Sequence, residues 1–456
     1  MHRAQRPPCG IARHLLGTSL ALVLAASCTK RDQSAREAPP SGSAATTAPT
    51  AAAPAAEAAQ GAATDSPTTG SPGAGPTESP DGIVAVAGSS ARNGPSEKAP
   101  SGPLTLSALE LPAGFSIEVY SAEVPNARSL ALGPKGVVFV SNRTEHNVYA
   151  LVDKNGDHKV DAVKVVAHGL DTPNGIAYRD GTLYIAEVGR LLRIDGIDGK
   201  LDEPSLRDLP EPKLITDQLP KETWHGWRYI KFGPDGWLYM PIGAPCNLCE
   251  RDDARFASVA RMKPDGSGLE VFASGVRNSV GYDWNPQTKE LWFTDNGRDE
   301  LGDDQPGDEL NRAAKAGLNF GFPYCHQGNL LDPSFGKGKS CKNYEPPARV
   351  LGAHVGALGM RFYTGKMFPE KYKSSIILAE HGSWNRAHKD GYRVMLAQLD
   401  GNKVVSYEPL VKGWLNVQTD QVSGRPVDVE ILDDGSLLVS DDYRGAVYRV
   451  TYKSPS

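Results

Sequence analysis

Apolar and polar positions follow a recurring pattern along the C-terminal part of this chain. Each copy has an apolar run, a short turn containing Gly or Asp, and a second apolar run, and both runs are rich in β-branched and aromatic residues. This combination is typical of β-hairpins. Convincing amphipathic helices are scarce. Six copies can be recognised, at residues 129–142, 175–194, 229–243, 280–297, 358–382 and 427–452.

The spacing of these copies predicts the architecture. The turn glycines Gly136, Gly181 and Gly236 follow one another at intervals of 45 and 55 residues, and the later intervals are longer. Repeats of about 40–50 residues that contain only strands are typical of the four-stranded blades of a propeller. We therefore predict an all-β fold, a six-bladed β-propeller over residues 104–456, with insertions between copies forming loops on one face. An array of β-sandwiches is the alternative, but sandwich strands would not repeat this pattern six times.

The first 103 residues have a different character. Residues 1–27 combine a basic start, a short apolar run from Leu15 to Ala26 and small residues before Cys28, which is the pattern of a lipoprotein-type signal peptide. Cys28 would then carry the lipid that anchors the protein to a membrane, and the protein would be periplasmic or on the cell surface. An ordinary signal peptide cleaved nearby is the alternative. Residues 28–103 are mostly Ala, Pro, Ser, Thr and Gly, which cannot bury enough apolar surface to fold, so we predict a disordered linker.

Charge and cysteine content narrow the function classes. The net charge is −5 and no basic stripe is present, so the sequence offers no electrostatic support for nucleic-acid binding. Cys246, Cys249, Cys325 and Cys341 lie in the predicted propeller, and an even number in an exported domain indicates disulfides. Because each pair is local, we predict Cys246–Cys249 and Cys325–Cys341. A zinc site formed by the four is the alternative, whereas haem attachment is disfavoured because Glu250, not histidine, follows "CNLC".

Several copies of the repeat are flanked by polar residues that a propeller would bring together. His225 precedes the third copy, Arg277 and Asn278 precede the fourth, and Arg425 in "SGRPVDV" precedes the sixth. Residues just before each inner strand converge on the central channel, so these side chains predict a pocket for an anionic ligand that forms hydrogen bonds. Surface ion pairs for the arginines and simple packing for the histidine are the alternatives. They leave the recurrence at one position of the repeat unexplained.

From about Leu109 to Tyr452 the chain resembles the glucose/sorbosone dehydrogenase family, soluble quinoproteins that use pyrroloquinoline quinone (PQQ). The strongest match is "GVRNSVGYDWNP…TDNG…GDELNRAAKAGLNFGFP". A histidine eight residues before a "GPDG" turn is also shared, met here by His225 and Gly233, and "GSWNR" and "GRPVDV" favour the sorbosone dehydrogenase branch. The resemblance implies a six-bladed propeller with PQQ over the channel mouth and Ca²⁺ bound to it.

The resemblance implies catalytic roles for two residues and cofactor contact for a third. His225 would be the general base, Arg277 would lie against the quinone carbonyl that becomes an oxyanion, and Asn278 would hydrogen-bond the cofactor. These roles agree with the chemistry of the side chains. A neutral imidazole, with an unperturbed pKa near 6.5, can take the hydroxyl proton of a substrate. A fixed guanidinium stabilises negative charge that develops in the transition state.

The resemblance also implies a set of cofactor and metal ligands. The backbone carbonyls of Gly297 and Arg298 would ligate calcium, a cation that prefers oxygen ligands. Arg425 would pair with the carboxylates of PQQ, which has three. A further cationic cofactor residue is expected after the fifth hairpin, and Arg386, with His381 behind it, is the candidate.

Three positions depart from the family pattern. Trp224 replaces an acidic residue that precedes the base in well-known sugar-oxidising members. Val427 replaces one of two cofactor arginines expected around "GRPVDV", and Arg298 stands where proline is more usual. These changes bear on substrate and cofactor affinity rather than on the fold. Nearby, Asp308 and Glu309 are expected to support the loop after the fourth unit rather than carry chemistry.

The stretch "DKNGDHKVD" is a second candidate metal site. Asp153, Asn155, Asp157 and Asp161 stand at alternate positions, as at the start of a calcium-binding loop. Glycine is at the fourth position instead of the sixth, however, and Lys164 occupies the place of the bidentate glutamate. A solvated hairpin turn is the alternative.

Three functions are compatible with these observations. The first is a lipid-anchored, PQQ- and Ca²⁺-dependent dehydrogenase of a sugar or sugar-derived aldehyde, aldose or sorbosone-like. It would pass electrons to a separate acceptor, a quinone or cytochrome, because the sequence has no haem motif. The second is a calcium-dependent lactonase on a similar propeller, which would need carboxylates as metal ligands in the channel. The third is a non-catalytic binding propeller. The arginines and the histidine favour the first.

Overall fold

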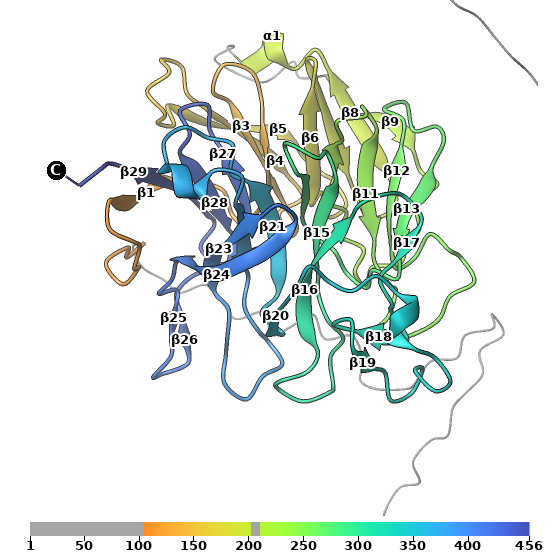
Figure 1. Cartoon of the computed structure of the whole chain (residues 1–456). Coiled ribbons are helices and arrows are strands. Elements are labelled where there is room, and N and C mark those ends of the chain that lie inside the picture. Colours follow the sequence, from red (N-terminus) through yellow and green to blue (C-terminus); the bar gives the residue numbers. More distant parts are fainter. Residues whose placement is uncertain (1–103, 202–209, 456) are drawn as a thin grey trace, which may run out of the picture. The chain divides into compact units, whose positions relative to one another are not determined.

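The regular structure of the protein is almost entirely β. The structure, a computed structural model, describes residues 104–201 and 210–455, so the predicted signal peptide, the lipid attachment at Cys28 and the linker lie outside the described residues. Six consecutive sheets of four or five strands surround a common centre (Figure 1). The predicted all-β, six-bladed propeller is therefore confirmed.

The blades are numbered 1 to 6 along the chain. Each has four antiparallel strands with the first strand innermost in the ring, and in blades 1 to 5 these four strands follow one another along the chain. The strands, blade by blade, are β2 (Ala127–Leu132), β3 (Val138–Asn142), β4 (Val148–Val152) and β5 (Ala162–Ala167); β6 (Gly175–Arg179), β7 (Thr182–Ala186), β8 (Leu191–Asp195) and β9 (Lys213–Thr216); β10 (Lys231–Phe232), β11 (Leu238–Ile242), β12 (Ser258–Met262) and β13 (Glu270–Ser274); β14 (Tyr282–Trp284), β15 (Leu291–Asp295), β16 (Gly307–Ala313) and β20 (Arg349–Ala353); β21 (Ala357–Phe362), β22 (Ile376–Glu380), β23 (Arg393–Asp400) and β24 (Lys403–Val411); β27 (Pro426–Ile431), β28 (Leu437–Asp441), β29 (Ala446–Tyr452) and β1 (Phe115–Ser121).

The ring closes through its N-terminal strand. β1 pairs antiparallel with β29, from Phe115 opposite Tyr452 to Ser121 opposite Val447. The outermost strand of blade 6 thus comes from the beginning of the domain, whereas its three inner strands come from the end. This pairing joins the first and last described strands of the propeller and leaves no gap in the ring.

Neighbouring blades are joined close to the axis. In three places a hydroxyl on the second strand of one blade donates to a main-chain carbonyl of the segment or strand that begins the next blade: Ser141 to Asn174 (2.6 Å), Thr294 to Leu358 (2.7 Å) and Ser440 to Arg128 (2.6 Å). The backbones approach so closely that a Cβ on Gly281 would lie 2.2 Å from the carbonyl oxygen of Leu358. A larger residue there would push two blades apart.

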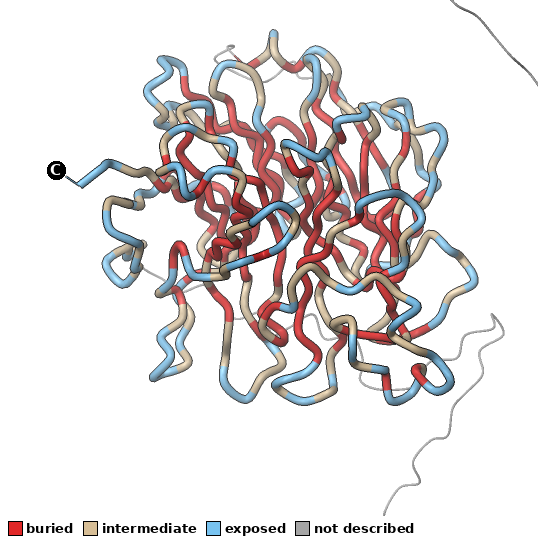
Figure 2. The backbone as a smooth tube through the Cα atoms, in the orientation of Figure 1, coloured by how far each residue is buried: buried red, intermediate tan, exposed pale blue. Residues whose placement is uncertain are grey.

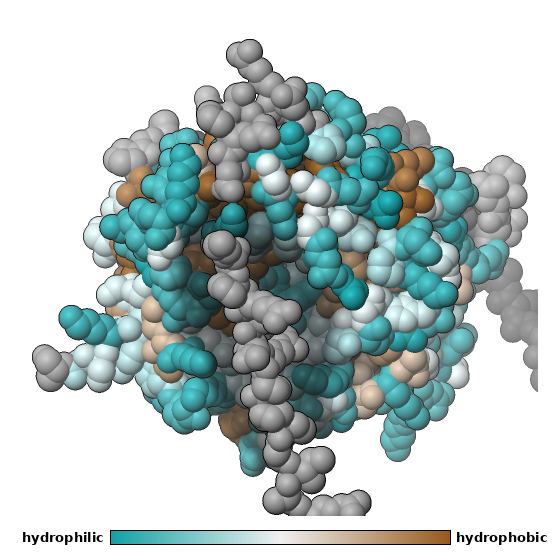
Figure 3. Space-filling view, turned by 90° about the horizontal axis from the view of Figure 1, so that it is seen from above, coloured by the Kyte–Doolittle hydropathy of each residue, from teal (hydrophilic) through white to brown (hydrophobic). Residues whose placement is uncertain are grey.

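In this propeller, the loops before the first strands and after the second strands of the blades lie at one end of the ring. The start of each first strand lies opposite the end of the second, as in the pairs Ala127–Asn142 and Pro426–Asp441. Segments before the first strands and after the second strands therefore share one face, which we call the site face and which lies toward the bottom of Figure 1. Figure 3 looks onto the opposite face, that of the tight hairpin turns, where hydrophilic residues cover much of the visible surface.

The core and the added elements complete the fold. Buried residues concentrate in the strands and exposed ones in the loops (Figure 2). None of the described helices is long and apolar enough to cross a membrane.

The additional elements are β17 (Leu318–Asn319), which extends blade 3, the hairpins β18 (Cys325–His326) with β19 (Leu330–Leu331) and β25 (Leu415–Asn416) with β26 (Gln421–Val422), the short helix α1 (Asp198–Leu201) and the 3₁₀ turns η1 (Cys341–Asn343) and η2 (Glu370–Tyr372).

Both predicted disulfides are present. Cys246 is bonded to Cys249, in the loop after β11, and Cys325 is bonded to Cys341, in the insertion between β16 and β20. The alternative of a zinc site formed by the four cysteines is therefore excluded.

Candidate active site

His225 lies between β9 and β10 with its side chain half-buried. Its φ is +50°, which is uncommon for a residue with a side chain. Gly243 makes room for it, because a Cβ there would lie 2.6 Å from the Cβ of His225. Nδ1 of His225 is 2.7 Å from the carbonyl oxygen of Ala244, which can only accept, so Nδ1 carries the proton. Nε2 then presents its lone pair and accepts a hydrogen bond from the indole N–H of Trp224 at 3.1 Å.

The electrostatic surroundings keep this imidazole neutral. Burial lowers the pKa of His225 well below its usual value of 6.5, and the charge of Arg277 lowers it further, against the opposing hydrogen bond to Ala244. A neutral imidazole is the form that can accept a proton. The ring is thus held in the protonation state and the tautomer that a general base at Nε2 requires.

Arg277 precedes β14, and its guanidinium is held on several sides. Its carbonyl accepts the N–H of Ala244 (2.8 Å), so Ala244 connects it to His225. The side chain is 5% exposed and donates to the carbonyl and the side-chain oxygen of Asn247 (both 2.9 Å). It also donates to the carbonyl of Asn296 and to the carboxylate of Asp299, both at 3.2 Å. A guanidinium has five N–H donors, so these four bonds fix its orientation.

Buried carboxylates position the backbone segments that carry the two site arginines. Asp295, at the end of β15, accepts the N–H groups of Arg277 (2.9 Å) and Asn278 (2.6 Å). Asp441, at the end of β28, accepts the N–H of Arg425 at 3.0 Å. Blades 4 and 6 therefore share one arrangement, in which a buried carboxylate accepts the backbone N–H of the arginine. Burial raises the pKa of Asp441 to about 6, and burial together with the charge of Glu309 raises the pKa of Asp295 well above its usual range.

The predicted calcium ligands follow β15. The N–H of Gly297 donates to Asp308 at 3.0 Å, and the other oxygen of Asp308 accepts from Gly356 (2.8 Å) and Ala357 (3.1 Å). The carbonyl oxygens of Gly297 and Arg298 accept no hydrogen bond from the described residues. Asp308 does support this loop, as predicted, and it leaves the two carbonyls available as ligands.

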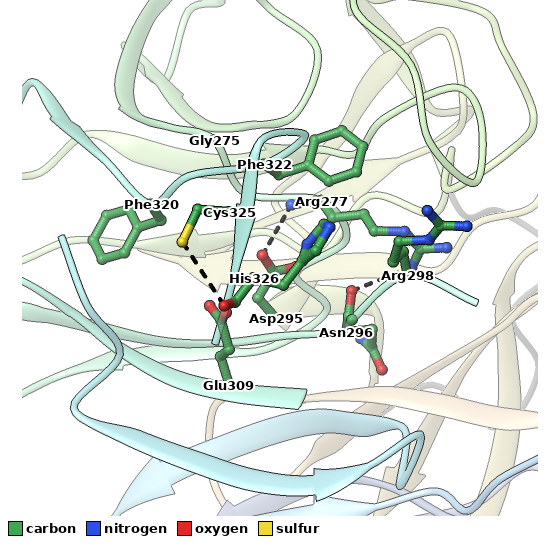
Figure 4. A pocket seen from close by; sticks show the side chains of 11 residues that line it. Gly275, Arg277, Asp295, Asn296, Arg298, Glu309, Phe320, Phe322, Cys325 and His326 are labelled. Carbon is green, nitrogen blue, oxygen red and sulfur yellow. Dashed lines mark hydrogen bonds between the residues drawn. The ribbon is translucent and has the colours of Figure 1, made fainter. Parts of the chain in front are cut away.

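A pocket lies beside these residues, and Figure 4 shows its lining. Glu309 is one of its carboxylates, and burial raises the pKa of this group to about 7. The guanidinium of Arg298 donates a hydrogen bond to the carboxylate of Asp332 (2.8 Å). The same carboxylate lies 3.0 Å from Nε2 of His326. The pocket is lined by Gly275, Arg277, Asp295, Asn296, Gly297, Arg298, Glu309, Phe320, Phe322, Cys325 and His326.

Arg386 and His381, both on the loop after β22, lie in different surroundings. The guanidinium of Arg386 donates to the carbonyls of Asp303 and Ala353 and lies 3.7 Å from the carboxylate of Asp304. No hydrogen bond joins it to His381. Nε2 of His381 is instead 2.9 Å from Asp442, in the neighbourhood of Arg425.

Residues that the sequence analysis did not single out complete the surroundings of Arg277. Asn385, next to Arg386, donates to Asp299 at 2.7 Å, and Asp299 is the carboxylate paired with Arg277. Asn247, which takes two hydrogen bonds from Arg277, lies between the two cysteines of "CNLC". The spacing of those cysteines predicted a disulfide in this loop. No pattern in the sequence indicated that the loop contacts Arg277.

The second candidate metal site forms a turn. The carboxylate of Asp153 accepts the backbone N–H groups of Asn155, Gly156 and His158, which accounts for the conformation of this hairpin. In the described part of the chain, one group of three possible metal-binding side chains comes together, formed by His158, Asp433 and Asp434. These residues lie in hairpin turns on the face opposite to His225.

The sequence is similar to known proteins over most of the propeller. Residues 197–450, more than half of the chain, match the family model described as glucose/sorbosone dehydrogenase. The chain is 32% identical over 357 residues to an uncharacterized protein of Borreliella burgdorferi, which covers 76% of this chain and 92% of that one. It is 27% identical over 182 residues to the aldose sugar dehydrogenase YliI of Escherichia coli, covering 37% of this chain and 46% of that one.

The fold also has a counterpart among solved structures. The holo form of the PQQ domain of pyranose dehydrogenase from Coprinopsis cinerea superposes with a TM-score of 0.62 at 17% identity, covering 78% of this chain and 99% of that one. At this identity the likeness concerns the propeller fold alone.

Proposed function

Because the chain belongs to the glucose/sorbosone dehydrogenase family, we propose that it oxidises a sugar or a sugar-derived aldehyde, aldose or sorbosone-like, using PQQ and Ca²⁺. The observation that supports this most directly is the state of His225. Its Nδ1 proton is engaged by Ala244, its Nε2 lone pair is directed away from that bond, and burial together with the charge of Arg277 lowers the pKa of the ring and favours its neutral form. A separate acceptor, a quinone or a cytochrome, would then take the electrons.

The chain's own residues account for proton removal and for charge stabilisation. Nε2 of His225 accepts the hydroxyl proton of the substrate, after the indole N–H of Trp224 gives up its hydrogen bond. PQQ, when bound, supplies the quinone that accepts the hydride. Arg277, already fixed by Asn247 and Asp299, provides a positive charge that needs no reorganisation during the reaction.

The residues present fit an anionic cofactor. PQQ has three carboxylates, and the site face provides Arg277 and Arg425 from blades 4 and 6. Arg128, on β2, adds a buried guanidinium whose Nη2 has no hydrogen-bond partner among the described residues. Buried donors without partners are costly, so an anionic group nearby would stabilise this arrangement. Asn278 remains a proposed cofactor contact, and so does Arg386, although the present contacts of Arg386 are to Asp303 and Ala353.

The carbonyls of Gly297 and Arg298 fit calcium. Ca²⁺ prefers oxygen ligands, and both carbonyls accept no hydrogen bond from the described residues. Asp295 and Glu309 line the same pocket, and because burial raises the pKa of both carboxyl groups, a bound Ca²⁺ would stabilise their ionised forms. We expect Ca²⁺ to raise the melting temperature of the protein and EDTA to reverse the shift.

Substitution of His225 tests the proposed reaction. In the PQQ- and Ca²⁺-loaded protein, His225→Ala should lower kcat for dye reduction with aldoses or sorbosone by about 10²–10⁴-fold, the usual contribution of a general base. His168→Ala, at an exposed position, is the matched control and should be unaffected. Unchanged dye reduction in His225→Ala would exclude His225 as the base. Absence of dye reduction in the loaded wild type would instead favour a binding propeller.

The membrane attachment is a separate proposal. The residues before Cys28 have the pattern of a lipoprotein signal, and we propose that Cys28 carries the lipid. Cys28→Ala should release the protein from the membrane fraction and abolish labelling with radioactive palmitate. Retention of the variant in membranes would contradict the lipid anchor.

A further inference from the structure

A second group of ionisable side chains, three of them arginines, lies on the site face, on blades other than those of His225 and Arg277. We call it the arginine cluster, and it consists of Arg128, Arg143, His381, Arg425 and Asp442. Arg128 is on β2 and Arg143 follows β3, so both belong to blade 1. His381 follows β22, and Arg425 and Asp442 flank the first hairpin of blade 6. By the geometry of the hairpins, all five lie at the same end of the ring as His225.

The single carboxylate of the cluster is already occupied. One oxygen of Asp442 accepts from Nη1 of Arg128 at 2.8 Å, and the other lies 2.9 Å from Nε2 of His381. Although burial opposes it, the contact with His381 and then the charge of Arg128 keep the pKa of Asp442 below its usual range. Asp442 is therefore ionised, and one negative charge faces three guanidinium groups.

Arg143 receives no such partner from the described residues. Its guanidinium lies over the ring of Trp227, 4.2 Å from the centroid, and Arg128 lies 5.5 Å from the same ring. Arg143 forms neither a salt bridge nor a side-chain hydrogen bond with the described part of the chain. Burial, and next the charge of Arg128, lowers the pKa of Arg143 to about 10, although the charge of Asp442 opposes this shift. Holding a half-buried guanidinium against another cation is costly unless an anion binds there.

The cluster also bears on Val427, which stands where the family pattern has a cofactor arginine. Val427 is 3% exposed and packs with Val280 and Leu358, side chains from two other blades. A charged side chain at position 427 would enter this apolar contact. Positive charge is supplied from blade 1 instead, by Arg128 and Arg143.

We propose that Arg143, supported by Arg128 and Arg425, binds a carboxylate group of PQQ and replaces the cofactor arginine that is absent at position 427. This inference rests on the proposed function, because it assigns the anion to PQQ. A planar guanidinium fixed on an aromatic ring suits a carboxylate, which it can contact through two N–H groups. Trp227, only two residues after His225, would place this contact near the proposed base.

The same chemistry could serve a substrate with a carboxylate, such as a uronic acid, so the test separates the two sources. PQQ binding to the purified full chain is measured without sugar, in Ca²⁺, by quenching of tryptophan fluorescence. Arg143→Gln should raise the Kd for PQQ by about tenfold or more, as expected for loss of a charge-assisted hydrogen bond. Arg143→Lys, which keeps the charge but not the planar fork, should lie in between.

Arg255→Gln is the matched control. Arg255 lies in a loop on the site face, is 40% exposed at its side chain, and pairs with Asp253, so its loss should leave the Kd unchanged. Wild-type affinity in Arg143→Gln would overturn the inference while leaving the proposed function intact. Arg143→Gln could instead change only the KM for glucuronate and leave PQQ binding unchanged. That result would assign the anion to the substrate and would also overturn the inference. Failure of the wild type to bind PQQ would overturn both proposals.

Discussion

The two cationic regions of the site face differ in how their charge is compensated. Around Arg277, Asn247, Asn296 and Asp299 take four hydrogen bonds from one guanidinium. In the arginine cluster, Asp442 binds Arg128 and His381, whereas Arg143 lies over the face of Trp227 and has no side-chain hydrogen bond or salt bridge with the described residues. A fully bonded guanidinium is set in place before the ligand arrives, whereas an incompletely bonded one depends on the ligand. The first arrangement suits catalysis and the second suits binding.

The largest expected effect, on both stability and turnover, is that of replacing Arg277, whose charge is compensated by its neighbours. Arg277→Met removes four hydrogen bonds and leaves Asp299 without its cation, so the free energy of unfolding should fall by about 3 kcal/mol, as for a broken buried ion pair. The turnover rate should fall by about 10²–10³-fold because a fixed charge is lost. Urea unfolding and dye reduction measure the two effects. If Arg143→Met destabilises the protein equally, the two regions do not differ as described.

The disulfide beside Arg277 should matter for activity more than for stability. Cys246 and Cys249 flank Asn247, whose two oxygens hold the guanidinium, but the loop that they close is very short. In the double variant Cys246→Ser/Cys249→Ser we expect kcat to fall by about tenfold, because misplacing a catalytic group is costly. The Kd for PQQ should change less than in Arg143→Gln. An unchanged kcat would show that Asn247 is held without the disulfide.

The pH dependence should show the coupling between His225 and Arg277. Since burial and Arg277 lower the pKa of His225, the acid limb of kcat/KM should lie below pH 6.5, and in Arg277→Met it should move upward. The same shift affects folding. Between pH 6.5 and the lowered pKa, the unfolded chain binds the proton and the folded one does not, so the free energy of unfolding decreases as the pH falls through this window. An acid limb at the same pH in both proteins would show that Arg277 does not act on His225.

The smallest expected effect is that of Arg143 on stability. Arg143→Gln loses a contact with Trp227 but breaks no ion pair with the described residues, so the free energy of unfolding of the ligand-free protein should change by less than about 1 kcal/mol. Thermal melts with and without PQQ test this. The variant should match the wild type alone and show the smaller stabilisation by PQQ.

Much of the site could be predicted from sequence because it repeats one position of the hairpin pattern. His225, Arg277 and Arg425 each precede a first strand, and the structure places these segments at one end of the ring. Arg128 and Arg143 flank the first copy in the same way. They were missed because single arginines near a strand are ordinary, and their common neighbour Trp227 is far away in the sequence.

The sequence by itself determined the hairpin repeat, the number of blades and the local disulfides. These follow from alternation of apolar residues, turn glycines and short separations, which act over a few residues along the chain. Only the tertiary structure decided that β1 completes blade 6, that Asn247 holds Arg277, and that Arg128 shares Asp442 with His381. These contacts join residues distant in sequence, and their partners are chosen by the closure of the ring, which no local pattern records.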